Sequence, residues 1–495
     1  MPKSIIIIGA GMGGLASGCY GQMNGYDTQI FEQHTSPGGQ STSWKRKGYT
    51  FDICIHHFYG GSPGSKLYQI WKELGVMPRE MVRPDDCVSV LSPDGKLFKD
   101  YYDMDKLEGQ LLEISPGDAR GIRDYLNSIR LFMGTDLMGE MVMGSLWSVL
   151  GTIAFRPARF KYLTLTMKKF AQRFSDPFLR RAFPLLIYSN PDIPMYLHLA
   201  RHPYGLNGVL QWPIGGASGL ARSIEKRYAE LGGKIHYRSK VQNILVENNQ
   251  AAGVKLADGS EHRSDVVISN ADGRKTILEM LEGKYVDQNT RVYCKEPADE
   301  TNWAVHVFLG VNRDLSGEPS SLIMLLDHPV VIANHKNESI EMQIYGFDKT
   351  LAPEGKGVIK VELISGYAYW KQLYTDKEKY NAEKRRVADQ VVEIIEKRFP
   401  GIRDQIEVID VPTLMTWERY VDETHGWLNF PNKKFSFIKS IGARGGQTTL
   451  PGLENFYFAG AWATMLGALW GNAISGRNAI RDICKKDRRK FVVSE

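Results

Sequence analysis

The sequence predicts an α/β fold in which one domain is assembled from three separated segments, with an α+β domain inserted between them. Two observations predict it. Strands alternate with helices at residues 1–65, 205–290 and 426–495, whereas residues 66–204 read as helices and residues 291–425 as an antiparallel sheet with helices. A chain of 495 residues with 43% hydrophobic and 24% charged residues is typical of globular proteins of this size.

The first segment begins with a strand, a glycine-rich turn and a helix. Ser4–Ile8 is an apolar, β-branched run, as in a strand that is buried on both faces of a parallel sheet. Gly9, Gly11 and Gly14 then form a G-x-G-x-x-G pattern before a helix, and the second strand ends at Glu32. This spacing predicts a Rossmann-like dinucleotide site, with phosphates at the turn and ribose hydroxyls bound by Glu32.

The other two segments of this domain repeat the alternation. The second contains a helix over 218–231, and its Asp258-Gly259 pair is a hairpin signal. The third contains the short strand Phe456–Phe458, a glycine-rich turn and a final helix. The strands expected in the second segment lie near 234–246, 251–257 and 265–269.

The inserted residues divide into two parts. Residues 66–204 are rich in Met, Leu and aromatic residues and are punctuated by prolines, which predicts a helical lid on the substrate side. Residues 291–425 predict the substrate-domain sheet and an amphipathic helix over 378–398. The strands expected there are 303–311, 322–326, 340–347 and 358–365.

Further motifs follow the glycine turn in a fixed order. They are Gly38-Gly39-Gln40, Phe51–His57, Trp212–Gly216, Val266–Asp272 and Phe458–Ala461. Together with the turn, they resemble the phytoene desaturase, carotenoid isomerase and retinol saturase family of the amine-oxidase-like FAD flavoproteins. The resemblance covers nearly the whole chain.

The resemblance implies an FAD cofactor and a set of residues that hold it. Gly38 and Gly39 would lie against the FAD, Val241 would meet the adenine through its backbone, and Gly460 with Ala461 would approach the pyrophosphate and ribityl chain. The complete set implied is Gly9, Gly11, Gly13, Gly14, Glu32, Gln33, Gly38, Gly39, Gln40, Val241, Asn270, Gly460, Ala461, Gly467 and Ala468.

The resemblance also implies an oxidoreductase that saturates or desaturates C=C bonds of an apolar polyene or isoprenoid lipid, such as a carotenoid or retinoid, by hydride transfer with flavin N5. Three departures weigh against strict desaturation: Gln40 in place of arginine, Cys54 in place of glycine, and Ala461 in place of a carboxylate. An FAD-dependent cis-trans isomerase without net redox change is the alternative. A non-catalytic prenyl-lipid carrier is a more distant one, and the substrate, the reaction direction and the electron partner stay open.

Three residues are candidates for the reaction itself. His56 and His57 lie in the segment that runs towards the flavin in this family, and an imidazole there can donate or accept a proton beside a hydride transfer. The alternative is a structural histidine bonded to backbone. Trp462 either walls the flavin pocket or packs in the core.

No metal site is predicted. His198 and His202 have the spacing of helical metal ligands, but Pro203 follows at once and no acidic partner is expected nearby, so a core or surface role is favoured. The five cysteines are scattered, without a C-x-x-C pair, and the amino terminus lacks the pattern of a secretory signal. These features predict a cytoplasmic protein.

Charge gathers in one part of the chain. The net charge of +6 is spread over 118 charged residues and does not indicate nucleic-acid binding. Residues 155–181, however, carry eight basic side chains against the single acid Asp176, interleaved with aromatic residues. They predict either a peripheral membrane-docking face on the cytoplasmic side or a solvated surface with its aromatic residues in the core.

Overall fold

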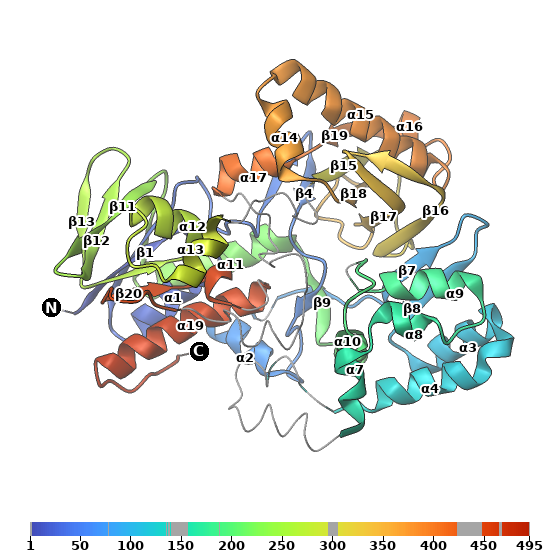
Figure 1. Cartoon of the computed structure of the whole chain (residues 1–495), viewed down its shortest axis with the longest axis horizontal. Helices are drawn as coiled ribbons and strands as arrows, with labels where there is room; N and C mark the ends of the chain where they lie inside the picture. The colour runs from blue at the N-terminus through green and yellow to red at the C-terminus, as the bar shows by residue number, and fades with distance from the viewer. Residues whose placement is uncertain are drawn as a thin grey trace.

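Figure 1 shows the computed structural model of the protein, which describes residues 2–77, 79–134, 136, 139, 157–187, 189–295, 305–422, 448–464 and 468–494. A parallel sheet with its helices lies on the left of this view. A larger mixed sheet and most of the remaining helices lie on the right. Residues from both bodies line one long cavity.

The parallel sheet has five strands in the order β10-β2-β1-β14-β20. Alternate isoleucines of β1 face opposite sides: Ile5 and Ile7 pack against helices, whereas Ile6 and Ile8 pack under a small antiparallel sheet. This two-sided burial explains the continuous apolar run, and the sheet confirms the predicted fold class. Its strands are β1 (Ser4–Ile8), β2 (Asp27–Phe31), β10 (Lys234–His236), β14 (Val266–Ser269) and β20 (Phe456–Phe458).

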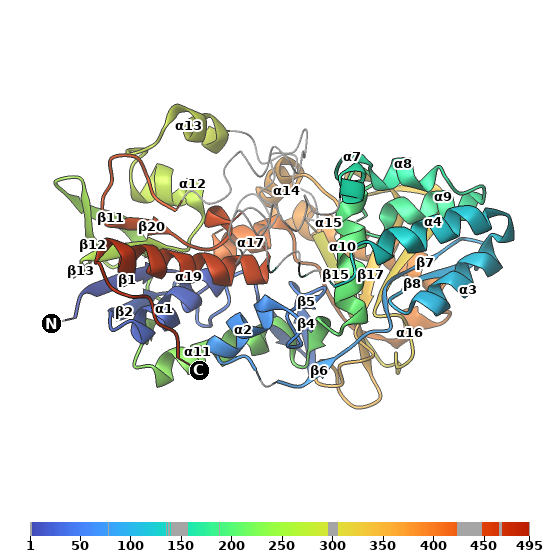
Figure 2. The same ribbon diagram turned by 90° about the horizontal axis from the view of Figure 1, so that it is seen from below.

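Three helices cover one face of this sheet, and three strands cover the other. Figure 2 shows α1 (Met12–Met23) and α19 (Leu469–Lys486) side by side, and α11 (Gly216–Glu230) also packs on α1. A Cβ on Gly476 would lie 2.8 Å from the backbone nitrogen of Ser17, so this glycine allows the close approach of α19. The opposite face carries β11 (Val241–Glu247), β12 (Gln250–Leu256) and β13 (Glu261–Arg263), and a hairpin joins β12 to β13 at Asp258-Gly259 as predicted.

The mixed sheet has seven strands in the order β19-β15-β18-β17-β16-β7-β8. Two of them, β7 and β8, come from the segment that was expected to be helical, which is a correction to the sequence-based division. The sequence does contain a β-hairpin signal here, because alternating apolar residues flank a Pro93-Asp94-Gly95 turn. The strands are β7 (Asp86–Leu91), β8 (Leu97–Tyr101), β15 (Val305–Val311), β16 (Ser321–Ile332), β17 (His335–Ile344), β18 (Gly357–Leu363) and β19 (Ile406–Asp410).

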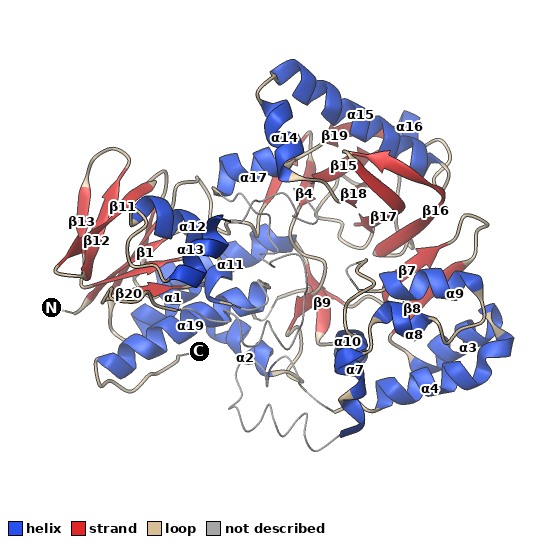
Figure 3. Cartoon of the chain, viewed as in Figure 1, coloured by secondary structure: helices blue, strands red, loops and turns tan. Residues whose placement is uncertain are grey.

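Helices of residues 104–206 gather at the end of the mixed sheet where β7 and β8 lie (Figure 3). They share an apolar core with Val88 and Val90 of β7 and Ile323 of β16. This part therefore packs on the sheet and does not form a separate module. Its helices are α3 (Met104–Ile114), α4 (Ala119–Arg130), α7 (Lys161–Thr164), α8 (Met167–Ala171), α9 (Pro177–Ala182) and α10 (Met195–Leu206).

The remaining elements connect these bodies or cover their edges. They are β3 (Ser43–Arg46), β4 (Tyr49–Asp52), β5 (Phe58–Tyr59), α2 (Lys66–Glu73), β6 (Met81–Val82), β9 (Leu210–Pro213), α12 (Gly273–Lys275), a π-helical turn (Thr276–Met280), α13 (Gln288–Lys295), α14 (Tyr367–Tyr374), α15 (Lys377–Glu396), α16 (Ile402–Gln405) and α17 (Leu414–Val421).

Residues 155 and 156 of the basic segment 155–181 lie outside the described residues, and the aromatic side chains of residues 157–181 lie mostly inside. Tyr162, Phe170, Phe174 and Phe178 belong to the core under the helices, whereas Phe160 is 48% exposed. This arrangement favours the alternative of a solvated surface with buried aromatic residues, and membrane contact stays a prediction. None of the described helices is long and apolar enough to cross a membrane.

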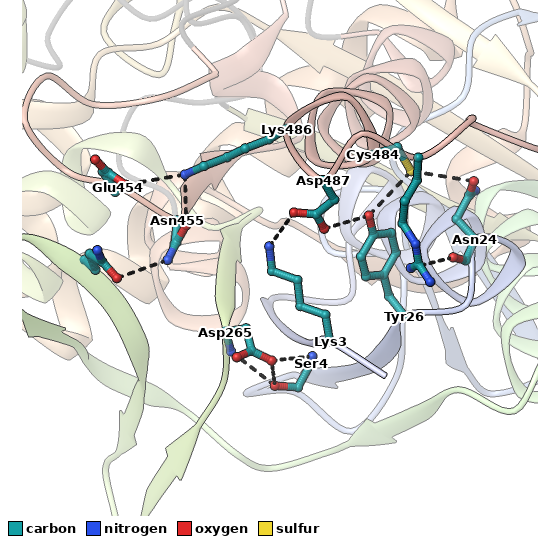
Figure 4. A network of polar contacts seen from close by, with 12 residues as sticks. Lys3, Ser4, Asn24, Tyr26, Asp265, Glu454, Asn455, Cys484, Lys486 and Asp487 are labelled. Carbon is teal, nitrogen blue, oxygen red and sulfur yellow. Dashed lines mark hydrogen bonds and ion pairs between the residues drawn. The ribbon is translucent and has the colours of Figure 1, made fainter. Parts of the chain in front are cut away.

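The two ends of the chain are tied together beside the parallel sheet (Figure 4). Asp487, after the end of α19, pairs with Lys3 at 2.7 Å and accepts a hydrogen bond from the hydroxyl of Tyr26 at 3.0 Å. Ser4 donates from its backbone nitrogen to Asp265 at 2.8 Å. The contacts of Asp487 hold the end of α19 against the sheet, and the Ser4–Asp265 hydrogen bond joins the starts of β1 and β14.

His198 and His202 do have an acidic partner, so that part of the sequence interpretation was wrong. Asp100 of β8 lies 2.8 Å from His202 Nε2 and 4.0 Å from His198 Nδ1. Tyr125 bonds to His198 Nε2 at 2.7 Å, and the Arg201 guanidinium lies 3.8 Å from Asp100. Because Arg201 balances the carboxylate, the cluster is a buried polar network in the core, consistent with the core role that was favoured.

This network predicts a loss of stability in acid. Burial lowers the pKa of His198 from 6.5 to about 3. Burial would raise the pKa of Asp100, but His202, His198 and Arg201 outweigh it and lower the pKa to about 2. Between pH 6.5 and 3 the unfolded chain binds a proton at His198 that the folded chain does not, so the free energy of unfolding decreases as the pH is lowered through this range. Below about pH 4 the unfolded chain also protonates Asp100 before the folded chain does, which lowers the stability further.

Replacement of His198 with Gln should therefore flatten the pH dependence of the free energy of unfolding between pH 6 and 4. The expected change in slope is about one proton, or about 1.4 kcal/mol per pH unit. Urea unfolding at several pH values measures this slope. An identical slope in the variant and the wild type would contradict the assignment.

Candidate functional site

One cavity of about 1110 Å³ runs from the carboxyl ends of β1 and β2 to the mixed sheet and the helical part. This volume lies just above the usual range for a ligand pocket, about 300–1,000 Å³. At one end it is lined by Ile8, Gly9 and Glu32, and at the other by His56, His57 and Ile187. Its position at the carboxyl edge of a parallel sheet is where such sheets bind ligands.

The glycine turn after β1 is shaped by close backbone approaches. A Cβ on Gly14 would overlap the carbonyl oxygen of Gly9, and a Cβ on Gly13 would lie 2.7 Å from Gly460 Cα. Gly11 is the N-cap of α1 and provides no side-chain cap. The first backbone N–H groups of α1 are thus available to an anion at this helix end.

Glu32 lies over this turn, directly after β2. Its two carboxylate oxygens accept hydrogen bonds at 2.7 Å from the backbone nitrogens of Ala10 and His34. The side chain is buried and also lines the cavity. Because each carboxylate oxygen has two lone pairs, both can accept a further hydrogen bond from a ligand hydroxyl.

The Gly38-Gly39 pair completes the same end of the site. The backbone nitrogen of Gly38 donates to the carbonyl of Ala10 at 2.9 Å, and both glycines have positive φ angles, of +116° and +59°. A Cβ on Gly39 would lie in ordinary van der Waals contact with Gly11 Cα, at 3.4 Å, so the positive φ is what favours glycine here. Bare backbone from two loops therefore faces the cavity here.

Asn270 joins the first loop to the turn after β20. Its side chain lies so close to Gly11, Gly13 and Gly460 that a Cβ on any of them would press on it. Gly460 has a φ angle of +80°, and its backbone nitrogen donates to Ser475 Oγ of α19 at 2.7 Å. The two turns and the start of α19 thus form one connected cradle.

The structure brings together most of the residues predicted to hold the cofactor. Gly13, Gly14 and Gly460 lie behind the cavity wall and support it. Gly467 lies outside the described residues. The predicted residues that line the cavity are Gly9, Gly11, Glu32, Gln33, Gly38, Gly39, Gln40, Val241, Asn270, Ala461 and Ala468.

Trp462 was expected either to wall a pocket or to pack in the core, and its position is compatible with both. It lines the cavity, and it also packs so closely on Gly273 that no side chain could be accommodated there. Ala468 is the N-cap of α19 and provides no side-chain cap, so a second helix amino terminus opens at the cavity.

Asp52 positions the segment that carries the two histidines. Its carboxylate accepts hydrogen bonds from the backbone nitrogens of Cys54 and Ile55, both at 3.2 Å, and from Ala217 at 2.6 Å at the start of α11. Burial raises the pKa of Asp52. This anchor holds residues 54–57 between the parallel sheet and the mixed sheet.

His56 and His57 both line the cavity but have different surroundings. His56 Nε2 lies 3.1 Å from Glu362 Oε1, in a pair that is mostly buried. His57 Nε2 lies 3.7 Å from Cys87 Sγ, and burial with the nearby Arg201 and His56 lowers the pKa of His57 well below its usual range. His57 is therefore a neutral imidazole, whereas His56 faces a carboxylate.

The partners of His56 were missed by the sequence reasoning. Lys360 and Glu362 lie on β18, where Lys360 is fully buried and its Nζ is 2.7 Å from Glu362 Oε1. The signal was two opposite charges two residues apart in an otherwise apolar strand, which places them on one face. Periodicity alone could not show that this face is turned towards His56.

The comparisons with known proteins agree with this architecture. Residues 7–74 match the model of a NAD(P)-binding Rossmann-like domain. The chain is 26% identical over 457 residues to the chloroplastic prolycopene isomerase of Arabidopsis thaliana, which covers 85% of this chain and 73% of that protein. It is 24% identical over 444 residues to a neurosporene-forming phytoene desaturase of Rhodobacter capsulatus, and this alignment covers 82% of this chain and 80% of that protein. The chain is a homologue of these enzymes.

Solved structures extend the likeness to the fold of the whole chain. An oxidoreductase from Methanosarcina mazei aligns with a TM-score of 0.60 and 19% identity, covering 97% of this chain and all of that one. A putrescine oxidase mutant aligns with a TM-score of 0.60 and 11% identity, covering 98% and 99%. A Rab GDI from Plasmodium falciparum aligns with a TM-score of 0.53 and 11% identity, and the alignment covers 99% of each chain. The fold alone thus does not determine the function of the chain.

Proposed function

We propose that the protein is an FAD-dependent enzyme that acts on a C=C bond of an apolar polyene or isoprenoid lipid. The observation that carries this proposal is the single cavity that joins a dinucleotide cradle to an inner end between the two sheets. When bound, the flavin would supply hydride exchange with a substrate carbon. The homology of the chain to prolycopene isomerases and phytoene desaturases supports a polyene substrate.

The residues present fit the cofactor. Gly11 and Gly39 leave bare backbone where a pyrophosphate must approach, and Glu32 offers acceptors for ribose hydroxyls. The start of α1 supplies N–H donors to phosphate, and the start of α19 would face the flavin, where negative charge develops on reduction.

The walls beyond the cradle suit a long apolar substrate. Many of their side chains are aliphatic or aromatic and come from the segment after β4, from α2 and from the helical part, where the polar Ser189, Asn190 and Asp192 also line the cavity. Such walls exclude water from the reacting carbons and hold a polyene by contact area. The apolar lining residues at this end include Ile55, Phe58, Trp71, Ile187, Ile193 and Leu197.

Product mass would decide among the reactions. Purified protein loaded with FAD would be incubated without oxygen with carotenoids, retinoids, prenyl quinones and unsaturated fatty acids. A gain or loss of two hydrogens identifies saturation or desaturation, whereas an altered retention time at unchanged mass identifies isomerisation. Protein that shows no flavin absorbance band and cannot take up FAD would refute the proposal and favour the lipid carrier.

Replacement of Glu32 with Ala should weaken FAD binding. A hydrogen bond to a charged group contributes about 1.5–3 kcal/mol, which corresponds to a roughly 10- to 100-fold rise in the dissociation constant. Glu32→Gln keeps one oxygen acceptor and should have a smaller effect. Fluorescence titration of the apoprotein with FAD measures both variants, and equal affinity of Glu32→Ala and wild type would rule out the assigned role.

A further inference from the structure

A row of titratable side chains crosses three neighbouring strands of the mixed sheet beside His56. In the strand register, His306 of β15 pairs with Glu362 of β18, and Glu362 pairs with Glu341 of β17. Lys360 lies two residues along β18 on the same face. Glu362 Oε1 is the common centre, at 2.7 Å from Lys360 Nζ, 3.1 Å from His56 Nε2 and 3.8 Å from His306 Nε2.

The surroundings keep Glu362 ionised. Burial alone would raise the pKa of Glu362, but His56 and Lys360 outweigh burial and hold it well below its usual range. Burial lowers the pKa of His306 to about 3, so this ring is neutral at physiological pH. Glu341, whose pKa is raised by burial and by Glu362, accepts a hydrogen bond from Ser189 Oγ at 2.8 Å. Glu362 is thus a fixed carboxylate and cannot supply a proton.

His56 is the member of this group that lines the large cavity. Its neighbour His57 is neutral, and burial raises the pKa of the Cys54 thiol to about 12. A carboxylate 3.1 Å from one imidazole nitrogen orients the ring, and an imidazole held in this way at the cavity wall can donate or accept a proton.

We infer that His56 is the catalytic residue that transfers the proton accompanying hydride exchange at the C=C bond, and that Glu362 is its positioning residue. This inference rests on the proposed function. In saturation, the bound flavin would supply a hydride to one carbon of the C=C bond, and the π electron pair would form the second C–H bond with the proton that His56 donates. In desaturation, His56 would accept the proton as the C–H electron pair becomes the π bond, and the bound flavin would take up the hydride.

The test uses FAD-loaded protein with a polyene that the wild type converts. His56→Gln should lower kcat by about 10²- to 10⁴-fold, the usual contribution of a general acid or base, with KM within threefold of wild type. The FAD dissociation constant and the unfolding temperature should stay at wild-type values. His335→Gln is the matched control, because His335 is an exposed histidine on β17 of the same sheet; its kcat should equal that of wild type.

Two further variants separate proton transfer from a structural role. His56→Ala should regain part of its rate with added imidazole, and the rescued rate should vary with the pKa of substituted imidazoles. Glu362→Gln should lower kcat by about 10- to 10⁴-fold, as expected when an orienting carboxylate is lost, and should change the pH profile of kcat. A role confined to packing would leave that profile unchanged.

A kcat of His56→Gln within threefold of wild type would overturn the inference, as would loss of rate without imidazole rescue and with weakened FAD binding. In either case, wild-type protein that binds FAD and changes the C=C bond would still support the proposed function. Wild-type protein that binds no FAD would refute both.

Discussion

Replacement of Gly13 with alanine should abolish cofactor binding and lower the free energy of unfolding by about 3 kcal/mol or more. The new Cβ would lie 2.5 Å from Asn270 Oδ1 and 2.7 Å from Gly460 Cα. A side chain could rotate away, but the backbone of Gly460 is held by its hydrogen bond to Ser475. The turn after β20 would have to move, and the cradle would open.

Flavin absorbance per mole of reconstituted protein and urea unfolding measure the two parts of this effect. Gly109→Ala is the matched control, because Gly109 lies in α3 and a Cβ added to it would have open space within 4 Å. In a helix this change should stabilise by about 0.5–1 kcal/mol and leave FAD binding unchanged. A Gly13→Ala protein with wild-type FAD content would show that α1 and the β20 turn do not form one rigid unit.

The dinucleotide cradle could be predicted because its information is local. Ser4–Ile8 and Phe456–Phe458 were predicted with the bounds that the structure shows, and Gly9, Gly11 and Glu32 follow a short fixed spacing. In each case a few neighbouring residues determine the conformation: an apolar run for a doubly buried strand, and glycines for a turn with positive φ.

The inner end of the cavity could not be predicted in the same way, because its contacts join residues far apart in sequence. Glu362 reaches His56 only because β18 pairs with β15 and β17. The same holds for the separate core network, in which Asp100 meets His202 over 102 positions. The strand β7 was missed for a related reason. One of its partners, β16, begins at Ser321, although its hairpin with β8 carries a local signal that the division into segments overlooked.

Replacement of Lys360 with Met should lower the free energy of unfolding by about 3–5 kcal/mol, the usual cost of breaking a buried ion pair from one side. Lys360 is fully buried, and its loss leaves the Glu362 carboxylate without the cation at 2.7 Å. The cost relative to wild type should shrink as pH falls, because without Lys360 the folded protein protonates Glu362 at a higher pH than wild type does. Urea unfolding at about pH 7 and about pH 5 measures this trend.

The double variant Lys360→Met, Glu362→Met separates stability from positioning. With both charges removed, no unpaired charge is buried at these two positions, so the free energy of unfolding should recover to within about 1–2 kcal/mol of wild type. Its kcat should nevertheless stay as low as that of Glu362→Gln, because His56 still lacks its carboxylate. A double variant as unstable as Lys360→Met would mean that packing, and not charge balance, carries the cost. A stable double variant with wild-type kcat would mean that the buried charges serve the fold alone.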